Sequence, residues 1–365
     1  MIVILALAFD DYLKGVKNHP QIKGYESGVE VYSGRVIMDV FPPNPTLTYN
    51  AMFMPGAISL NQPIPLSWPI KSLSSVETKR AMEYHYLGLE NEFLFMAINS
   101  YLDAVYLQEK IRILEGILKN LQSVYKSISA LYKVGKIPES DLKRIEAKMN
   151  VISADIEGAR GELLGKMKLV EYFYGKSVDS LEFPPIDTLP ELESLLRDVE
   201  KSPYIKSQHH ARRSSYYNRL SSILSLTPVL SPEILYNKGK ISFSLSVEIP
   251  LWLPKYFGDL KGSQSEYKMQ EYLYRSVKSR INSEVYSEYE AYVSALNRLK
   301  SLEMSLKGLE KAYFSELSKY KTTGAGTTDY LFVQNDILET ELAIIKEKLE
   351  VIRRVYRVKS LLGTI

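Results

Sequence analysis

Residues 241–251 read ISFSLSVEIPL, and this stretch decides which fold the chain can adopt. Every second residue is apolar, and the residues between them are three serines, one glutamate and Pro250. A period of two places the apolar side chains on one face of a β-strand and the polar ones on the other. The stretch contains no basic residue, and about ten residues is the length at which a tilted strand spans a bilayer. We therefore predict a strand with one apolar face and one wet face.

The same pattern occurs in the first half of the chain. Between Ile58 and Trp68, apolar residues again occupy most alternate positions. A shorter strand signal precedes each stretch, and residues typical of turns (Met54–Ala57 and Asn237–Gly239) separate the two strands of each pair. Each half is thus expected to form one β-hairpin, at about 46–66 and at about 224–251.

After Pro69 and Pro254 the apolar period changes from that of a strand to that of a helix. From Leu107 to Tyr132, apolar residues recur at alternating spacings of four and three, which is a heptad seam. The first helix, at about 58 residues, would be roughly 90 Å long, more than a soluble globular domain needs. Two antiparallel coiled-coil hairpins are predicted, with helices at about 74–132, 138–173, 262–321 and 327–361.

The two halves match each other in order along the chain. Residues 13–23 read LKGVKNHPQIK, and residues 196–206, at an offset of 183, read LRDVEKSPYIK. Residues 59–69 (SLNQPIPLSWP) match 244–254 (SLSVEIPLWLP) at an offset of 185, and four later matches share an offset of 188. This conserved order indicates an ancient internal duplication. The predicted units are 9–178 and 196–365, joined by a linker at 179–195, and each contains a short helix that starts at Pro20 or Pro203.

Composition excludes several classes of function. Lys and Arg total 46 against 43 Asp and Glu, and a net charge of +3 is too weak to indicate a nucleic-acid partner. The chain has no cysteine, which excludes disulfides, thiolate metal sites and thiol nucleophiles. His209 and His210 lack a carboxylate or a third ligand at helical spacing, so we interpret this pair as a solvated helix face. We expect no cofactor, no metal site, no catalytic residues and no enzymatic activity.

The two breaks between the long helices carry the same residues. Tyr132 precedes Asp141 by nine residues at the first break, and Tyr320 precedes Asp329 by nine at the second. Each aspartate falls in the first turn of the return helix, after Pro138 in the first case, where a negative charge complements the helix dipole. Helix capping is one explanation of both aspartates. The alternative is that they also have a further role at the hairpin tips.

One combination of motifs occurs in order in the chain. It comprises Asn-x-Pro near the start, a strand ending in Ile-Pro-Leu, a long helix, Tyr-x-x-Gly with a later Asp-Leu, and a closing Leu361-Leu362-Gly363. The combination resembles the outer-membrane efflux protein family, the TolC-like exit ducts, over both halves of the chain. The resemblance implies a mixed α and β membrane protein. In it, a homotrimer shares a twelve-stranded transmembrane β-barrel, with four strands from each chain, that continues as a periplasmic α-helical barrel.

The resemblance also implies a function and partners. It implies an outer-membrane exit duct of a tripartite efflux or type I secretion system, fed by an inner-membrane pump of RND or ABC type through a periplasmic adaptor. Similar ducts close their periplasmic end with a basic residue and a second aspartate at positions that hold Ala325 and Phe332 in this chain. The gate is therefore expected to use Asp329, Phe332, Tyr320 and Asp141. Adaptor docking is expected at the hairpin tips, with Tyr132, Gly135, Pro138, Thr323, Gly324 and Gly326.

The strand count supports the same assembly on physical grounds. Four strands with open edges cannot lie in lipid, because their unpaired backbone groups would have no hydrogen-bond partner there. Two chains would give eight strands, whose interior is filled by side chains, whereas three give twelve and leave a pore. The alternative is a coiled-coil scaffold of the cell envelope without a channel, in which the period-two segments form a small stabilising sheet.

The first residues have two interpretations. Residues 1–9 read MIVILALAF, which is similar to the end of a secretory leader without its basic start. Residues 1–8 would then be absent from an exported protein. A buried first strand is the alternative.

Overall fold

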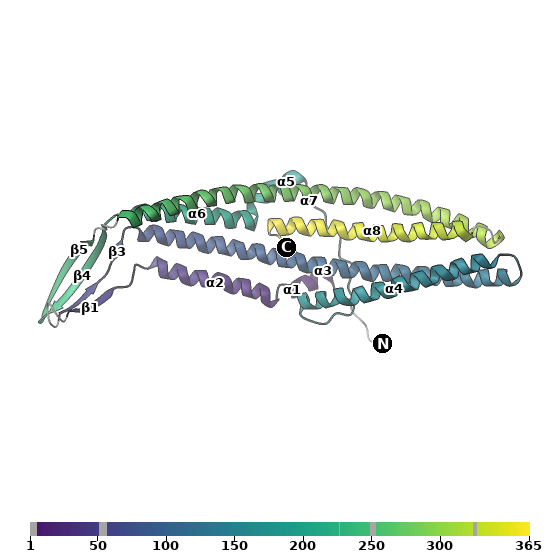
Figure 1. Ribbon diagram of the computed structural model, residues 1–365, viewed down its shortest axis with the longest axis horizontal. Helices are drawn as coiled ribbons and strands as arrows, with labels where there is room; N and C mark the ends of the chain where they lie inside the picture. Colours follow the sequence, from purple (N-terminus) through teal and green to yellow (C-terminus); the bar gives the residue numbers. More distant parts are fainter. Residues whose placement is uncertain (1–5, 51–56, 226, 249–252, 324–326) are drawn as a thin grey trace.

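A small sheet lies at one end of the molecule, and long helices run from it to the opposite end (Figure 1). The computed structural model describes residues 6–50, 57–225, 227–248, 253–323 and 327–365. The first half contains the helices α1 (Phe9–Val16), α2 (Pro20–Val40), α3 (Trp68–Lys133) and α4 (Glu139–Tyr174) and the strands β1 (Thr46–Asn50), β2 (Ala57–Asn61) and β3 (Ile64–Pro65). The second half contains α5 (Leu192–Asp198), the 3-10 turn η1 (Val199–Lys201), α6 (Pro203–Leu224), β4 (Val229–Asn237), β5 (Lys240–Glu248), α7 (Leu253–Thr323) and α8 (Thr327–Leu362).

The long helices begin earlier than the sequence pattern predicts. α3 starts at Trp68 and α7 at Leu253, so the expected starts near 74 and 262 are wrong. Pro69 and Pro254 do not delay them, because the first backbone N–H groups of a helix have no intrahelical partner and proline costs nothing there. For the same reason α2 and α6 start at Pro20 and Pro203, but they run for 21 and 22 residues. The expectation that these two helices are short is therefore wrong as well.

The strands form one antiparallel sheet in the order β1-β2-β4-β5. β2 and β3 keep the same register against β4, so they are one strand whose ladder is interrupted. Pro63 and Pro232 lie at the interruption and have no N–H to donate, although the Gln62 amide still bonds the Pro232 carbonyl at 3.1 Å. Each half thus forms the predicted hairpin. The turn at Lys238 and Gly239 is confirmed, with φ of 48° and 78°, whereas 51–56 lie outside the described residues.

Between the sheet and the opposite end of the molecule, the helices pack side by side. α3 packs against α2, α6, α4 and α8, and α7 packs against α6 and α8. In Figure 1, α4 and α7 are therefore the outermost helices of the part that holds the two coiled-coil hairpins, α3 with α4 and α7 with α8. The predicted heptad seam is the buried one: Leu114, Leu121 and Ile128 of α3 pack with Ile145 and Ile152 of α4. None of the helices in the described ranges has the length and apolar character that a membrane-crossing helix needs.

One face of the helix layer is covered at mid-length by α1 and by the segment that follows α4. Phe9, Tyr12 and Val16 of α1 are buried against α3. The Tyr101 hydroxyl of α3 lies 2.8 Å from both the Leu7 and the Glu182 carbonyl oxygens. Leu7 also forms a parallel bridge with Leu181. Residue 7 is thus part of this packing, and the two interpretations of residues 1–8 stay predictions. Residues 1–5 lie outside the described residues.

Candidate functional site

The sheet exposes its apolar face. Across the sheet, Leu47, Leu60, Ile234 and Phe243 pair in one row, and Tyr49, Ile58, Tyr236 and Ile241 pair in the next. All eight side chains are exposed. A row of Thr48, Ser59, Leu235 and Ser242 and a row of Thr46, Asn61, Glu233 and Ser244 form the opposite face, which is mostly polar. A soluble protein buries such an apolar face, so this sheet is built to meet an apolar surrounding on one side and a polar one on the other.

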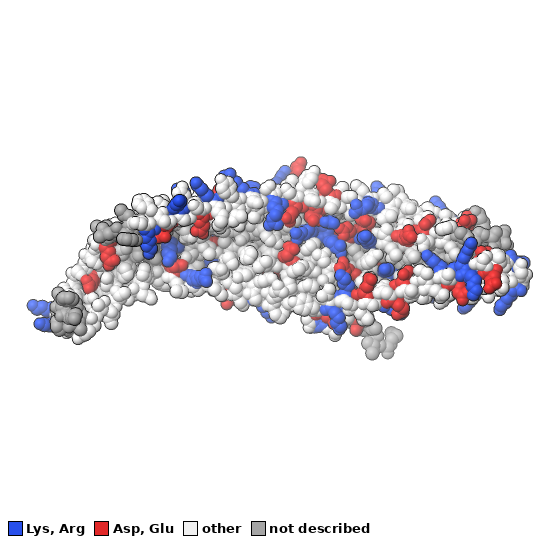
Figure 2. Space-filling model, in the orientation of Figure 1, with Lys and Arg blue, Asp and Glu red and all other residues white. Residues whose placement is uncertain are grey.

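The sheet also has two open edges. In the described residues, β1 pairs with β2 alone and β5 pairs with β4 alone. Each outer strand therefore presents unpaired backbone donors and acceptors, which bind another strand readily. In Figure 2 few charged side chains lie over the sheet, whereas Lys, Arg, Asp and Glu gather over the middle of the helices and toward the hairpin tips.

The first hairpin tip is a left-handed helix cap. Gly135 has a φ of 71°, its amide bonds the Tyr132 carbonyl at 2.9 Å, and the Lys136 amide bonds the Leu131 carbonyl at 3.0 Å. This pair of bonds is the Schellman arrangement, and its positive φ favours glycine. Ile137 is buried in the adjacent cluster and anchors the turn. Pro138 then caps α4, so Tyr132, Gly135 and Pro138 do form one tip, as the sequence predicts.

At the second tip the structure describes fewer of the predicted residues. Tyr320 and Thr323 lie at the end of α7, and nothing is described of their side chains. Gly324 and Gly326 lie outside the described residues. Asp329 is exposed in the first turn of α8, and Phe332, one turn on, is 65% exposed.

The gate residues of the two hairpins lie on separate tips. Asp141 is in the first turn of α4, as predicted for a capping residue, and its carboxylate lies 3.8 Å from Arg144. A polar bond joins the two return helices from Lys148 Nζ to Asn335 Oδ1, at 2.6 Å. The expected link between Tyr320 and Asp141 therefore stays a prediction. Sequence reasoning missed Tyr330, which is buried and packs against Tyr313 with the two rings tilted and their centres 5.5 Å apart.

The histidine pair is not a solvated helix face, and that interpretation is wrong. His210 Nδ1 lies 2.6 Å from Glu77 Oε2, and the Glu77 side chain is only 5% exposed. Arg80 and Arg213 contact the other carboxylate oxygen at 3.3 Å and 3.4 Å. The carboxylate comes from α3, which is distant from α6 in the sequence, so helical spacing could not reveal it. Burial is the larger cause and the positive charge of Arg212 the next, and both lower the pKa of His209.

The tyrosines of the covered face are structural. Burial raises the pKa of Tyr12 and of Tyr101 well above the ordinary phenol value, and it raises the pKa of Tyr356 to about 12. These hydroxyls therefore keep their protons at all physiological pH values, and those of Tyr12 and Tyr101 donate hydrogen bonds to backbone carbonyls. Tyr12 donates to the Ala97 carbonyl at 3.0 Å, which ties α1 to α3. Groups of three or more potential metal ligands are absent from the residues that the structure describes.

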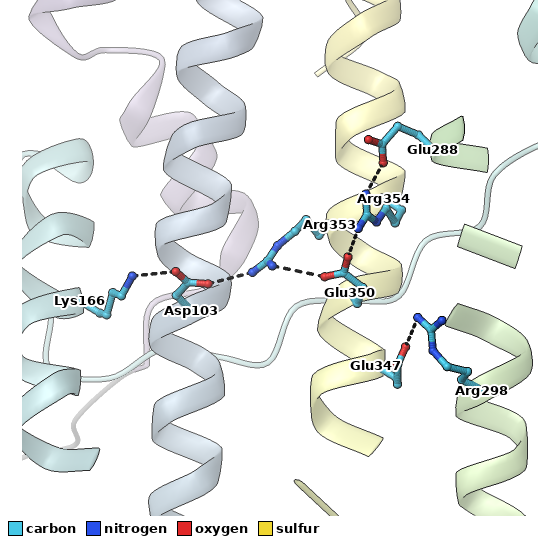
Figure 3. A network of polar contacts seen from close by, with 8 residues as sticks. All are labelled: Asp103, Lys166, Glu288, Arg298, Glu347, Glu350, Arg353 and Arg354. Atoms are coloured by element: carbon cyan, nitrogen blue, oxygen red, sulfur yellow. Dashed lines mark hydrogen bonds and ion pairs between the residues drawn. The ribbon is translucent and has the colours of Figure 1, made fainter. Parts of the chain in front are cut away.

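The face of the helix layer opposite these tyrosines carries a network of ion pairs (Figure 3). Asp103 of α3 bonds Lys166 of α4 and Arg353 of α8, both at 2.8 Å. Arg354 bonds Glu288 of α7 at 2.8 Å. Sequence reasoning missed this network, because its members come from distant parts of the chain and none belongs to a motif.

Comparison with known proteins identifies the architecture. No protein-family model matches the sequence, and no curated protein matches it. The structure matches the outer-membrane channel OprN with a TM-score of 0.81 at 15% identity, covering 98% of this chain and 90% of that one. CusC, whose crystal structures concern transmembrane channel formation, matches with a TM-score of 0.81 at 14% identity over 97% and 91%. The Campylobacter jejuni outer-membrane channel CmeC matches with 0.78 at 14% over 97% and 85%.

The chain has the fold of these outer-membrane channels. The resemblance drawn from ordered motifs is thereby confirmed at the level of fold. The low identity explains why the signal in the sequence is a pattern of periods and turn residues, since few individual positions coincide.

Proposed function

We propose that the chain is the outer-membrane exit duct of a tripartite efflux or type I secretion system. Three copies would form a twelve-stranded barrel in the outer membrane and a helical tunnel in the periplasm, which conduct cargo passively. The observation that carries this proposal is the sheet, which has one exposed apolar face, one polar face and two open edges. Lipid around the apolar face requires every backbone group to be paired, and only a closed barrel meets that requirement.

The helices offer a contact between copies that supports a homotrimer. Gly158, Gly161 and Gly165 of α4 lie on the side of the helix away from the buried Ile152 and Ile156, and a Cβ at any of them would meet nothing within 4 Å. Glycine inside a helix costs about 1 kcal/mol each relative to alanine. Such a face suits the close approach of another helix.

The opposite edge of the chain offers a matching surface. A groove along α7 is lined by residues that include Val293, Ser294, Asn297 and Ser301. The distance from Ser301 to the tip end of α7 is similar to the distance from Gly158 to the tip end of α4. The two surfaces therefore lie at similar distances from the hairpin tips. α4 of one copy can therefore pack against α7 of the next, and three such contacts close a ring.

The hairpin tips lie farthest from the sheet (Figure 1), where a periplasmic adaptor would dock. We assign docking to the first tip, around Tyr132, Gly135 and Pro138, and to its counterpart at Thr323, Gly324 and Gly326. The inner-membrane pump, of RND or ABC type, would supply the energy. Asp329, Phe332, Tyr320 and Asp141 would form the periplasmic gate.

Cysteine cross-linking tests the assembly directly, because the chain has no native cysteine. Gly161→Cys combined with Ser301→Cys should form disulfides between neighbouring copies and give a covalent trimer in a non-reducing gel. Within one chain α3 and α8 lie between these helices, so an intrachain bond is not expected. Gly116→Cys with Ser301→Cys is the matched control and should give monomers.

Cell fractionation separates the duct from the envelope scaffold, the alternative function. A duct is recovered from the outer membrane and keeps the mass of a trimer in detergent. A monomer recovered from the soluble fraction would refute both the trimer and the membrane location.

A further inference from the structure

The start of α2 depends on the side chain of a histidine. His19 is the N-cap residue of α2, and its Nδ1 atom accepts a hydrogen bond from the Gln21 amide at 3.2 Å. Its backbone carbonyl accepts two more, from the Ile22 amide at 3.0 Å and from the Lys23 amide at 3.3 Å. Pro20 has no amide hydrogen, so His19 accepts the hydrogen bonds of the first three amides of the helix.

The side-chain part of this cap requires the neutral form of the imidazole ring. A neutral histidine has one nitrogen that donates and one that accepts, whereas both nitrogens of the imidazolium donate. Because Nδ1 of His19 accepts from Gln21, this bond assigns the proton of the neutral ring to Nε2. A second proton would remove the acceptor and place a positive charge at the positive end of the helix dipole. Histidine is the side chain that ordinarily changes its charge between about pH 5 and 8, so acid opposes this cap.

Two aromatic rings hold the imidazole of His19 in this place. It packs against Phe93 of α3 with ring centres 4.8 Å apart, and against Tyr172 of α4 with ring centres 5.1 Å apart. This packing is available to both forms of the imidazole, and aromatic rings attract a cation more strongly than a neutral group. His19 is half-buried, so protons from the solvent reach it. Acid should therefore leave the ring in position and open the helix turn that it caps.

Charged and titratable groups surround His19 on the elements that pack against it. Lysines disfavour an added positive charge on the ring, and carboxylates favour it. Burial raises the pKa of Glu90, with a smaller lowering by Lys17 and a further rise from Glu26. Protonation of Glu90 in acid therefore stabilises the fold, which is opposite in sign to the loss of the cap. The groups are Lys17, whose Nζ bonds an oxygen of Ile365, Lys23 and Glu26 on α2, Glu90 on α3, and Tyr172 and the ion pair of Lys168 and Glu171 on α4.

The second half of the chain offers an internal comparison. Residues 13–23 match residues 196–206, and this match places Ser202 at the position of His19. Ser202 is the N-cap residue of α6, but its hydroxyl bonds the Leu361 carbonyl of α8 at 2.7 Å instead of a helix amide. A serine hydroxyl does not change its charge in the range where histidine does. The start of α6 therefore lacks the acid-sensitive group that the start of α2 contains.

We propose that His19 is an acid-sensitive cap, which holds the first turn of α2 at neutral pH and releases it in acid. The release is local, because α1 is buried against α3 on one side of the turn. The far end of α2 is held where Trp68 Nε1 bonds the Asp39 carbonyl at 3.0 Å. One of the two duplicated helices thus responds to acid and the other does not. Each of these contacts lies within one chain, so the cap does not depend on the proposed duct function.

Hydrogen exchange of the detergent-solubilised full chain tests the cap. The measured quantity is the protection of the amides of 21–25, relative to an unstructured peptide of the same sequence at the same pH. Protection should fall about fivefold between about pH 7.5 and about pH 5, because loss of an N-cap typically costs about 1 kcal/mol. The amides of 204–208 in α6 are the internal control, and their protection should stay unchanged.

Two substitutions separate the cap from other effects of acid. His19→Asn keeps a capping side chain that does not titrate, so the protection of 21–25 should stay high at both pH values. His19→Ala removes the side-chain cap and should give low protection at both. Glu90→Gln is the matched control for a neighbouring titratable group and should keep the pH dependence of the unmodified protein.

Three results would overturn the proposal. The first is equal protection of 21–25 at the two pH values in the unmodified protein. The second is a fall in acid that persists in the His19→Asn variant. The third is a parallel fall in 204–208, which would indicate general unfolding in acid. The comparison of the unmodified protein with His19→Asn is decisive even if the alanine variant does not fold.

Discussion

Leu60 on β2 lies directly opposite Ile234 on β4, and both side chains are exposed on the same face of the sheet. This pair joins the hairpin of the first half of the chain to the hairpin of the second half. It makes one continuous apolar surface from two segments that are far apart in the sequence. The side chains of both rows on this surface are exposed, an arrangement that is favourable in lipid and unfavourable in water.

Adjacent residues on β5 allow the two faces to be tested separately. Leu245 is 63% exposed on the apolar face, and Ser244 is on the polar face. Leu245→Lys should prevent stable insertion, because a lysine facing mid-bilayer costs about 2–4 kcal/mol per chain. Ser244→Lys, the matched control, should insert and change only conductance. Outer-membrane yield and trimer content in detergent are the measurements, and equal yields for the two variants would contradict a lipid-facing sheet.

Bulk at the first hairpin tip should uncouple the duct from its pump. Gly135 has a φ of 71° and open space around it, so a larger side chain fits but strains the backbone by about 1–2 kcal/mol. Gly135→Ala carries that strain without bulk and serves as the control. Gly135→Trp should abolish export with trimers intact, whereas Gly135→Ala should export normally. Full export by the tryptophan variant would exclude the tip as a docking surface.

The gate residues predict a cation-sensitive constriction. In the proposed trimer, three exposed Asp329 carboxylates would lie near one axis, where they would repel each other and attract cations. Single-channel conductance should be cation-selective and blocked by divalent or trivalent cations, and Asp329→Asn should weaken the block. Tyr320→Phe should raise the resting conductance if its hydroxyl holds Asp141 of another hairpin, since such a bond contributes about 1.5–3 kcal/mol. If both variants behave as wild type, Phe332 is the next residue to test.

Glu341 on α8 predicts a pH dependence of stability. Burial raises the pKa of its carboxyl, with a smaller lowering by Arg112 and a further rise from Glu310. The folded protein therefore binds this proton more tightly than the unfolded chain, and the ionised form destabilises the fold above the raised pKa. Glu341→Gln should raise the melting temperature at pH 7, and the gain should vanish as the pH falls below the ordinary glutamate pKa.

The control for this prediction is Glu339→Gln, on the exposed side of the same helix. It removes the same charge without removing a buried carboxylate. A melting temperature of the Glu341→Gln variant that is unchanged at pH 7, or a gain that persists in acid, would show that burial of this carboxyl does not affect folding.

Local periodicity allowed much of the fold to be predicted from the sequence. The period of two at Ile241–Val247 depends on side-chain alternation alone, and the heptad seam through Leu114 and Ile128 depends on helix geometry alone. Both patterns are properties of neighbouring residues, so they survive at 14% identity to known channels. The same holds for Gly135, because the left-handed cap at the end of α3 is a local requirement.

Only the tertiary structure decided which distant residues meet. The partner of His210 is Glu77 on another helix, and the partners of Asp103 are Lys166 and Arg353, 63 and 250 residues away. Such pairs follow from the way whole helices pack, which depends on the sum of many weak apolar contacts. No regular spacing of residues in the sequence reveals them. Tertiary packing also contributes to the start of α3 at Trp68. A proline permits a helix to begin, but the sequence around it does not show whether the first turn packs well enough to be helical.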